Sequence, residues 1–142
     1  MGLLELTDQV AAQLEQHLTP NIPELQVTAQ MNFNPTPPAI DMYPADPFQN
    51  QTDYGPLVRE AFFTVRARVT TADQDIGQAN LLEMMDPVSA SSVTAALTSD
   101  PSFAGSCQDS TVEGPSGYIV YQDPGGQGSN LLGAEWRLRV IL

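Results

Sequence analysis

Two stretches of the chain alternate between apolar and polar residues, one in the middle of the chain and one at its end. The apolar positions are Ala61, Phe63, Val65, Ala67 and Val69 in the first stretch, and Leu132, Ala134, Trp136, Leu138, Val140 and Leu142 in the second. Successive side chains of a β-strand point to opposite faces of the sheet. Each stretch therefore predicts a strand with one apolar face and one face that carries arginine: Arg66 and Arg68, then Arg137 and Arg139. We expect both strands in one sheet, with helices covering the apolar face.

Three stretches have the spacing of amphipathic helices: residues 3–18, residues 73–85 and a short stretch that ends at Leu97. In each, apolar side chains recur every three or four positions, which places them on one face of a helix. The expected inward positions are Leu3, Leu6, Val10, Leu14 and Leu18, then Ile76, Ala79, Leu82 and Met85 (or Leu81), and finally Val93, Ala96 and Leu97. Ser91 or Ser92 is expected to cap the third helix.

The rest of the chain predicts shorter strands and two loops. Residues 25–33 and 39–43 are expected to be strands, the second at a sheet edge because prolines flank it. Residues 44–56 predict a long proline-rich loop, and residues 106–113 and 117–122 predict two short strands split by a Gly-Pro-Ser sequence. A glycine-rich hairpin tip at residues 123–130 leads into the last strand, which is expected to pair antiparallel with 117–122.

These elements predict an α+β fold in a single domain, residues 1–142. We expect an antiparallel or mixed sheet of four to five strands, with the N-terminal helix and two further helices packed on its apolar face. No stretch reaches the roughly 20 apolar residues that a membrane-spanning helix needs, so no membrane partner is expected.

The chain is strongly acidic. Seventeen Asp and Glu residues face five basic residues, all of them arginine, which gives a formal net charge of −12. This disfavours a nucleic-acid partner, because such binding depends on neutralising phosphates. Four of the five arginines are the ones named above, within the two alternating stretches. The fifth, Arg59, lies just before the first stretch. They form either a solvated strand face or a basic patch that meets acidic surface on another copy of the chain.

Residues with catalytic potential are scarce. The chain has one histidine, His17, and one cysteine, Cys107, and it lacks the motifs of phosphate-binding loops, zinc proteases and serine hydrolases. Cys107 is expected on the 106–113 strand as a small, weakly polar residue. We therefore expect a protein that is not an enzyme and that has no metal or cofactor.

The segments follow one another in a fixed order: an N-terminal helix, a proline-rich segment, an REAFFTVRARV strand, a helix ending in LLEMMDP, an SVTAAL helix, a DPSFAG turn, a Gly-Tyr strand and a closing Gly-Ala-Glu-Trp strand. Together they resemble the tail terminator (tail completion) proteins of long-tailed bacteriophages, especially phages of actinobacteria. The resemblance spans nearly the whole chain. It implies an α+β virion subunit, assembled in the host cytoplasm, that forms a ring, commonly a hexamer.

Such a ring caps the tail tube, stops its polymerisation and joins it to the head. The partners that the resemblance implies are therefore further copies of the chain, the tail tube protein and the head–tail connector proteins. A connector (neck) protein is the alternative within the virion, and a small ligand-binding α+β domain is the alternative outside it.

A ring of acidic copies repels itself at every joint, which predicts where copies meet. We expect the arginine face to form the positive half of a head-to-tail contact. Its acidic partners are expected on or beside the second helix, at Asp73, Asp75, Glu83 and Asp86. The two loops are expected to touch neighbouring subunits or the adjoining ring, through Phe48, Tyr54, Gly125 and Gly126.

Overall fold

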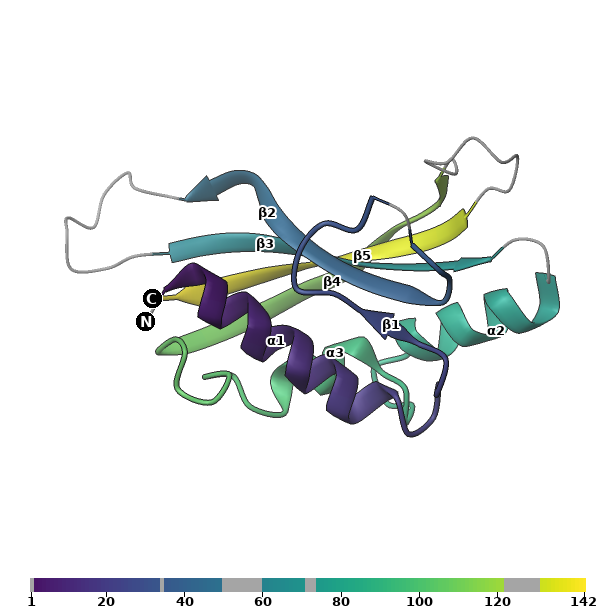
Figure 1. Cartoon of the computed structure of the whole chain (residues 1–142), viewed down its shortest axis with the longest axis horizontal. Coiled ribbons are helices and arrows are strands. Elements are labelled where there is room, and N and C mark those ends of the chain that lie inside the picture. Colours follow the sequence, from purple (N-terminus) through teal and green to yellow (C-terminus); the bar gives the residue numbers. More distant parts are fainter. Residues whose placement is uncertain (1, 34, 50–59, 71–73, 122–130) are drawn as a thin grey trace.

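The computed structural model describes residues 2–33, 35–49, 60–70, 74–121 and 131–142. Its elements are α1 (Leu3–Leu18), β1 (Gln26–Val27), β2 (Ala39–Gln49), β3 (Glu60–Thr70), α2 (Gln74–Met85), α3 (Val93–Thr98), β4 (Asp109–Tyr121) and β5 (Leu131–Ile141). The strands form one sheet in the order β1-β2-β3-β5-β4, in which β1 runs parallel to β2 and the other neighbouring pairs are antiparallel. All three helices lie on one face of the sheet (Figure 1). The predicted α+β fold class is confirmed.

The two alternating stretches form the centre of the sheet. β3 and β5 pair along their whole length, with Val65 opposite Trp136 and Ala67 opposite Ala134. These four side chains and Phe63 are all buried on the face that the helices cover. Burying a large apolar side chain stabilises a fold by about 1.5–3 kcal/mol relative to leaving it exposed. The predicted strands and the predicted apolar face are therefore confirmed.

Helices α1 and α3 follow the predicted pattern. The buried leucines and valine of α1 are Leu6, Val10, Leu14 and Leu18. Leu3, in the first turn, is exposed instead. The two helices are joined by Gln13, whose side-chain amide donates to the Ala96 carbonyl at 2.8 Å. Ser92 caps α3 as predicted, because its hydroxyl accepts a hydrogen bond from the Ala95 backbone N–H at 3.1 Å.

Helix α2 forms where the sequence predicts it, but it turns a different face toward the sheet. The residues predicted to point inward but found exposed are Ile76, Ala79 and Leu82. The residues buried instead are Leu81, which was the predicted alternative, and Met84. The cause is the close approach of α2 to β3 at Gly77, where a Cβ atom would lie 2.3 Å from the Thr70 carbonyl oxygen. Because only glycine fits against backbone at this distance, Gly77 sets the face that packs.

Strand β1 is shorter than the predicted strand 25–33, and β2 is longer than the predicted strand 39–43. Met31 and Phe33 are exposed after β1 has ended. β2 continues through Pro44 into the region predicted as a loop, and its pairing with β3 becomes irregular there. Among the described strands, β2 has an outer neighbour only at Ala39 and Ile40, and a strand edge tolerates proline because no ladder needs its N–H.

Strand β4 is a single strand where the sequence predicts two. Its pairing with β5 shifts between Glu113 and Ser116 and again before Ile119. The Gly-Pro-Ser sequence is therefore a bulge within one strand, not a break between two. Gly114 makes this possible, because its φ of +116° is a conformation that side chains rarely adopt. The predicted antiparallel pairing with the last strand is confirmed at residues 119–121.

Candidate functional site

The four arginines predicted to share one face do so. Arg66 and Arg68 project from β3, and Arg137 and Arg139 project from the neighbouring strand β5. Their positions alternate with the buried apolar positions of both strands, so they lie on the sheet face opposite the helices. This face is not an open positive patch, because carboxylates of the same chain lie among the guanidinium groups.

Asp41 is the central carboxylate of this face. β2 places it opposite Arg66, whose Nε donates to Asp41 Oδ1 at 3.1 Å and whose Nη2 donates to Oδ2 at 2.6 Å. Arg68 Nη2 donates to the same Oδ2 at 3.2 Å and to the Asn32 carbonyl oxygen at 3.0 Å. The Asn32 backbone N–H donates to Oδ2 at 2.9 Å. One fully buried carboxylate therefore holds two guanidinium groups and fixes the segment that leads into β2.

The guanidinium group of Arg66 also lies between two tyrosine rings. Its central carbon is 5.0 Å from the ring centre of Tyr43 and 5.4 Å from that of Tyr121. The hydroxyls of both tyrosines donate to Glu135 Oε1, at 3.4 Å for Tyr43 and 2.8 Å for Tyr121. Because these residues come from β2, β3, β4 and β5, the network connects four of the five strands through their side chains.

Burial and neighbouring charge shift the pKa values in this network. Burial, with the hydrogen bond to Glu135, raises the pKa of Tyr121, and burial with the Glu135 charge raises the pKa of Tyr43. Burial lowers the pKa of Arg68. Burial also acts to lower the pKa of Arg66, but the two hydrogen bonds to the Asp41 carboxylate outweigh the effect of burial and raise this pKa. At neutral pH both tyrosines are therefore neutral and both arginines are charged.

The other two arginines lie farther along β5. Arg139 Nη2 is 2.5 Å from Glu60 Oε1, and this hydrogen bond lowers the pKa of Glu60. Arg137 is exposed, and its guanidinium carbon lies 4.3 Å from the ring centre of Phe62. Three of the four arginines thus bind carboxylates of their own chain, so a positive contact with another copy would rest mainly on Arg137.

Two of the predicted acidic partners, Glu83 and Asp86, lie on the opposite side of the sheet. Glu83 is exposed on α2, and Asp86, just beyond the helix, is exposed as well. Because α2 packs on the helix-covered face, neither carboxylate shares the arginine face within one copy (Figure 1). The predicted charge contact between copies stays a prediction. Four of the predicted contact residues lie outside the described residues: Tyr54, Asp73, Gly125 and Gly126. The side chain of Asp75 also lies outside them.

Sequence reasoning did not find the carboxylates that bind the arginines. Asp41 and Glu60 were not predicted as partners, and neither was Glu135 as an acceptor for the tyrosines. A signal for Asp41 does exist: within β2 it occupies the position that alternates with the buried Ile40 and Met42, which assigns it to the polar face. Its contact with Arg66 depends on the register of β2 against β3, which the sequence pattern does not determine.

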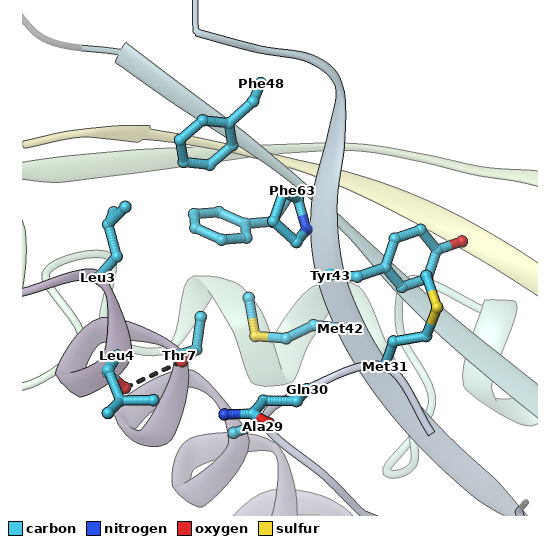
Figure 2. Close-up of a pocket in the computed structure, with 11 residues that line it drawn as sticks. Leu3, Leu4, Thr7, Ala29, Gln30, Met31, Met42, Tyr43, Phe48 and Phe63 are labelled. Carbon is cyan, nitrogen blue, oxygen red and sulfur yellow. Dashed lines mark hydrogen bonds between the residues drawn. The ribbon is translucent and has the colours of Figure 1, made fainter. Parts of the chain in front are cut away.

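An apolar groove lies at the β2 edge of the sheet, between the first turns of α1 and strands β2 and β3 (Figure 2). Its volume is about 350 Å³. The large apolar side chains that line it include Leu3, Leu4, Met31, Met42, Phe48 and Phe63, and no charged side chain lines it. Figure 2 shows Leu3, Met42, Phe48 and Phe63 pointing toward one another from α1, β2 and β3, and Met31 beside Tyr43.

Two of the lining residues, Phe48 and Thr7, have partners within the chain. Phe48, predicted to be a loop residue that reaches a partner, lies in β2 and packs edge-on against Phe63, with ring centres 5.4 Å apart at 83°. The hydroxyl of Thr7, one of the few polar groups in the groove, already donates to the Leu4 carbonyl at 2.9 Å. The groove therefore offers mainly apolar contact rather than hydrogen bonds to an occupant.

The opposite edge of the sheet carries a second apolar surface, in β4. Tyr118, Ile119 and Val120 are consecutive and are 43%, 51% and 57% exposed. Consecutive strand residues point to opposite faces, so β4 is apolar on both sides at this point. Sequence reasoning treated this stretch as an ordinary strand. The missed signal is an uncharged run, residues 117–121, in a chain of high net charge.

The remaining chemistry of the described residues is modest. Cys107 precedes β4, contrary to the prediction that it lies on the strand, and burial raises the pKa of its thiol, which lowers its reactivity. In the described ranges, no three His, Cys, Asp or Glu side chains gather as a metal site would require. No helix in this part of the chain is long and apolar enough to cross a membrane. Comparisons with models of protein families and with curated proteins find no match to this chain.

Proposed function

We propose that this chain is a structural subunit of a bacteriophage virion that assembles into a ring, caps the tail tube and joins it to the head-side connector. In this role it is a tail terminator and not an enzyme. Its partners are further copies of itself, the tail tube protein and the connector proteins. The resemblance of the whole chain to tail terminator proteins supports this proposal, and the α+β fold agrees with that resemblance.

The structural observation that carries the proposal is the position of exposed apolar surface. The helices bury one face of the sheet. Apolar side chains are nevertheless exposed at both edges of the sheet, in the groove beside β2 and in the Tyr118–Val120 run of β4. Apolar surface that a soluble chain leaves exposed marks sites of interaction. Two such sites on opposite edges suit a subunit that has a neighbour on each side.

The two alternatives differ from the proposal in what they predict. A neck protein would use the same surfaces to form a ring, but the ring would bind the connector and not the end of a tail tube. A ligand-binding domain has one observation in its favour, because the groove volume of about 350 Å³ falls within the usual range for small-molecule sites. Such sites also hold converging polar groups, whereas the polar side chains of the groove are Thr7, Gln30 and Tyr43, and the hydroxyls of Thr7 and Tyr43 are already bonded within the chain.

The decisive experiment mixes the purified protein with polymerising tail tube protein of the same phage and images the products by electron microscopy. The proposal predicts a ring at one end of each tube and shorter tubes as more protein is added. Tubes that grow to the same lengths with bare ends would contradict it. A ring that binds purified connector but leaves tubes bare would assign the chain to the neck instead.

A further inference from the structure

We propose that neighbouring copies of this chain join head to tail by an apolar contact, in which the β4 edge of one copy fills the groove of the next. The β4 surface consists of Tyr118, Ile119 and Val120, and we call it the edge patch. The groove is the one between α1, β2 and β3. The inference rests on the proposed ring for its biological meaning, but the contact itself can be tested on the purified chain.

The edge patch is a surface that isolated proteins avoid. An edge strand presents backbone groups that can pair with another chain, and monomeric proteins protect such edges with charges, prolines or bulges. β4 has these protections at Glu113 and Pro115. Beyond the bulge, the patch has three exposed apolar side chains and no charge, so that it is open to a partner.

The groove supplies a matching surface. Leu4 is 62% exposed and Met31 is 40% exposed at its rim, and Met42 and Phe63 are buried at its base. The Thr7 and Tyr43 hydroxyls of the groove are bonded within the chain, so apolar side chains that enter the groove would not leave these two groups unsatisfied. The groove is therefore suited to apolar side chains of a protein partner.

The distribution of charge fits a second copy of the chain as the partner. Each copy carries a net charge of −12, so two copies repel wherever their carboxylates approach each other. The groove lining contains no charged residue, and neither does the run of residues 117–121. The edge patch and the groove therefore allow identical acidic chains to meet with little repulsion.

The sheet geometry permits this pairing. β4 runs antiparallel to β2, because each of the three pairs between them in the sheet is antiparallel. A neighbour related by rotation about an axis along the strands would thus bring its β4 antiparallel to β2. The two surfaces are different and lie on opposite edges, so the contact is heterologous and can close into a ring.

Closure also requires the strands to tilt. Ile119 of β4 pairs with Gly133 of β5, which in turn pairs with Arg68 of β3. Met42 of the groove pairs with Val65 of β3, so the patch and the groove lie at different heights along the strands. Bringing the patch to the groove therefore shifts each copy along the strand direction. In a closed assembly, tilted strands absorb such a stagger. With untilted strands the same contact would build a helical filament.

The test uses two variants that each disable one surface. The patch variant carries Ile119→Asp and Val120→Asp, and the groove variant carries Leu4→Asp and Met31→Asp. All four residues are exposed, so both variants should retain the circular dichroism spectrum of the native fold. The matched control is Leu82→Asp with Val88→Asp, which places the same two charges on exposed apolar residues elsewhere. A second patch variant, Ile119→Gln with Val120→Gln, repeats the test without added charge.

Sedimentation or native mass measurements then give distinct outcomes. We expect rings for the native chain and the control, monomers for each variant alone, and dimers for an equimolar mixture of patch and groove variants. The mixture stops at two copies because it restores one functional contact and leaves two disabled surfaces. Rings in either variant, a mixture that stays monomeric, or loss of rings in the control would each overturn the contact while leaving the proposed ring in place. A monomeric native chain would contradict both.

Discussion

At the scale of single residues, Asp41 holds together the arginine face of the sheet. Its carboxylate binds Arg66 and Arg68 and accepts a hydrogen bond from the Asn32 backbone, all within a site where its side chain is fully buried. The two arginines respond differently: burial acts to lower both pKa values, but the hydrogen bonds to Asp41 raise the pKa of Arg66, whereas burial lowers that of Arg68. Removing the negative charge would leave two guanidinium groups close together without a counter-ion.

We therefore expect Asp41→Asn to destabilise the fold by about 3–5 kcal/mol, the usual cost of removing one partner from a buried ion pair. Asp46→Asn is the matched control, because Asp46 lies on the same strand and is exposed, and its effect should stay within about 0.5 kcal/mol. Urea unfolding of both variants measures the difference. Equal stability of the two variants would show that Asp41 does not hold the arginines in the native state.

The core makes a second prediction at this scale. Trp136 is fully buried in the centre of the sheet, so Trp136→Ala should lower the free energy of unfolding by about 3–5 kcal/mol. Ile76→Ala is the informative comparison, because the sequence pattern assigned Ile76 to the core whereas the structure leaves it 61% exposed. Thermal unfolding should show a large loss for the first variant and little change for the second. A large loss for Ile76→Ala would restore the sequence-based orientation of α2.

At the scale of elements, α1, β3 and β5 could be predicted because a single strong pattern defines each of them. α2 could be located but not oriented. Its apolar residues occupy more than one face, and periodicity favoured the face with Ile76 and Leu82, whereas the structure buries Leu81 and Met84. The choice depends on Gly77, which lets the helix approach the backbone of Thr70. This contact belongs to the tertiary structure, and no local pattern contains it.

Gly77→Ala tests this account of α2. Alanine favours a helix over glycine by about 1 kcal/mol, so propensity alone predicts a more stable variant. The structure predicts the opposite, because the new Cβ would lie 2.3 Å from the Thr70 carbonyl oxygen. We expect a net loss of about 1–3 kcal/mol as the helix is displaced. Gln78→Ala, at the neighbouring exposed position, should have little effect, and a Gly77→Ala variant with a higher melting temperature would contradict the packing.

The strands show a related limit. A Gly-Pro-Ser sequence ordinarily indicates a break, so the sequence pattern divided β4 into two strands. The structure accommodates it as a bulge because β4 pairs on one side only, with β5, among the described strands. Similarly, the prolines of β2 predicted a loop, yet pairing with β3 continues as far as Pro44 and resumes at Gln49. In both strands the tertiary partner, not the local sequence, decides where the strand ends.

At the scale of the whole molecule, the proposed ring has to join copies that each carry a net charge of −12, so its contacts must avoid repulsion. The sequence pointed to the arginine face, but internal ion pairs occupy Arg66, Arg68 and Arg139. Arg66→Glu would therefore place a carboxylate beside buried Asp41 and unfold the chain rather than test an interface. Arg137 can be changed without breaking an ion pair that the structure shows.

Arg137→Glu thus isolates the predicted charge contact. If Arg137 meets carboxylates of the next copy, the variant should stay folded and assemble more slowly, because charge complementarity acts mainly on the rate of encounter. Arg137→Gln should have an intermediate rate. Light scattering after dilution from dissociating conditions measures the rates, and the difference should shrink at high salt, where screening acts within about 3 Å. Identical rates for all three proteins would place Arg137 in solvent and leave the apolar contact as the joint.

The central claim is that this chain forms a closed ring, and the native mass of the purified protein tests it most directly. The account predicts one dominant species, most simply six copies of the 15.3 kDa chain, with no larger multiples. A closed ring gives a single mass because each copy uses both of its surfaces. A 15.3 kDa monomer at micromolar concentration, or an open ladder of increasing masses, would contradict the claim.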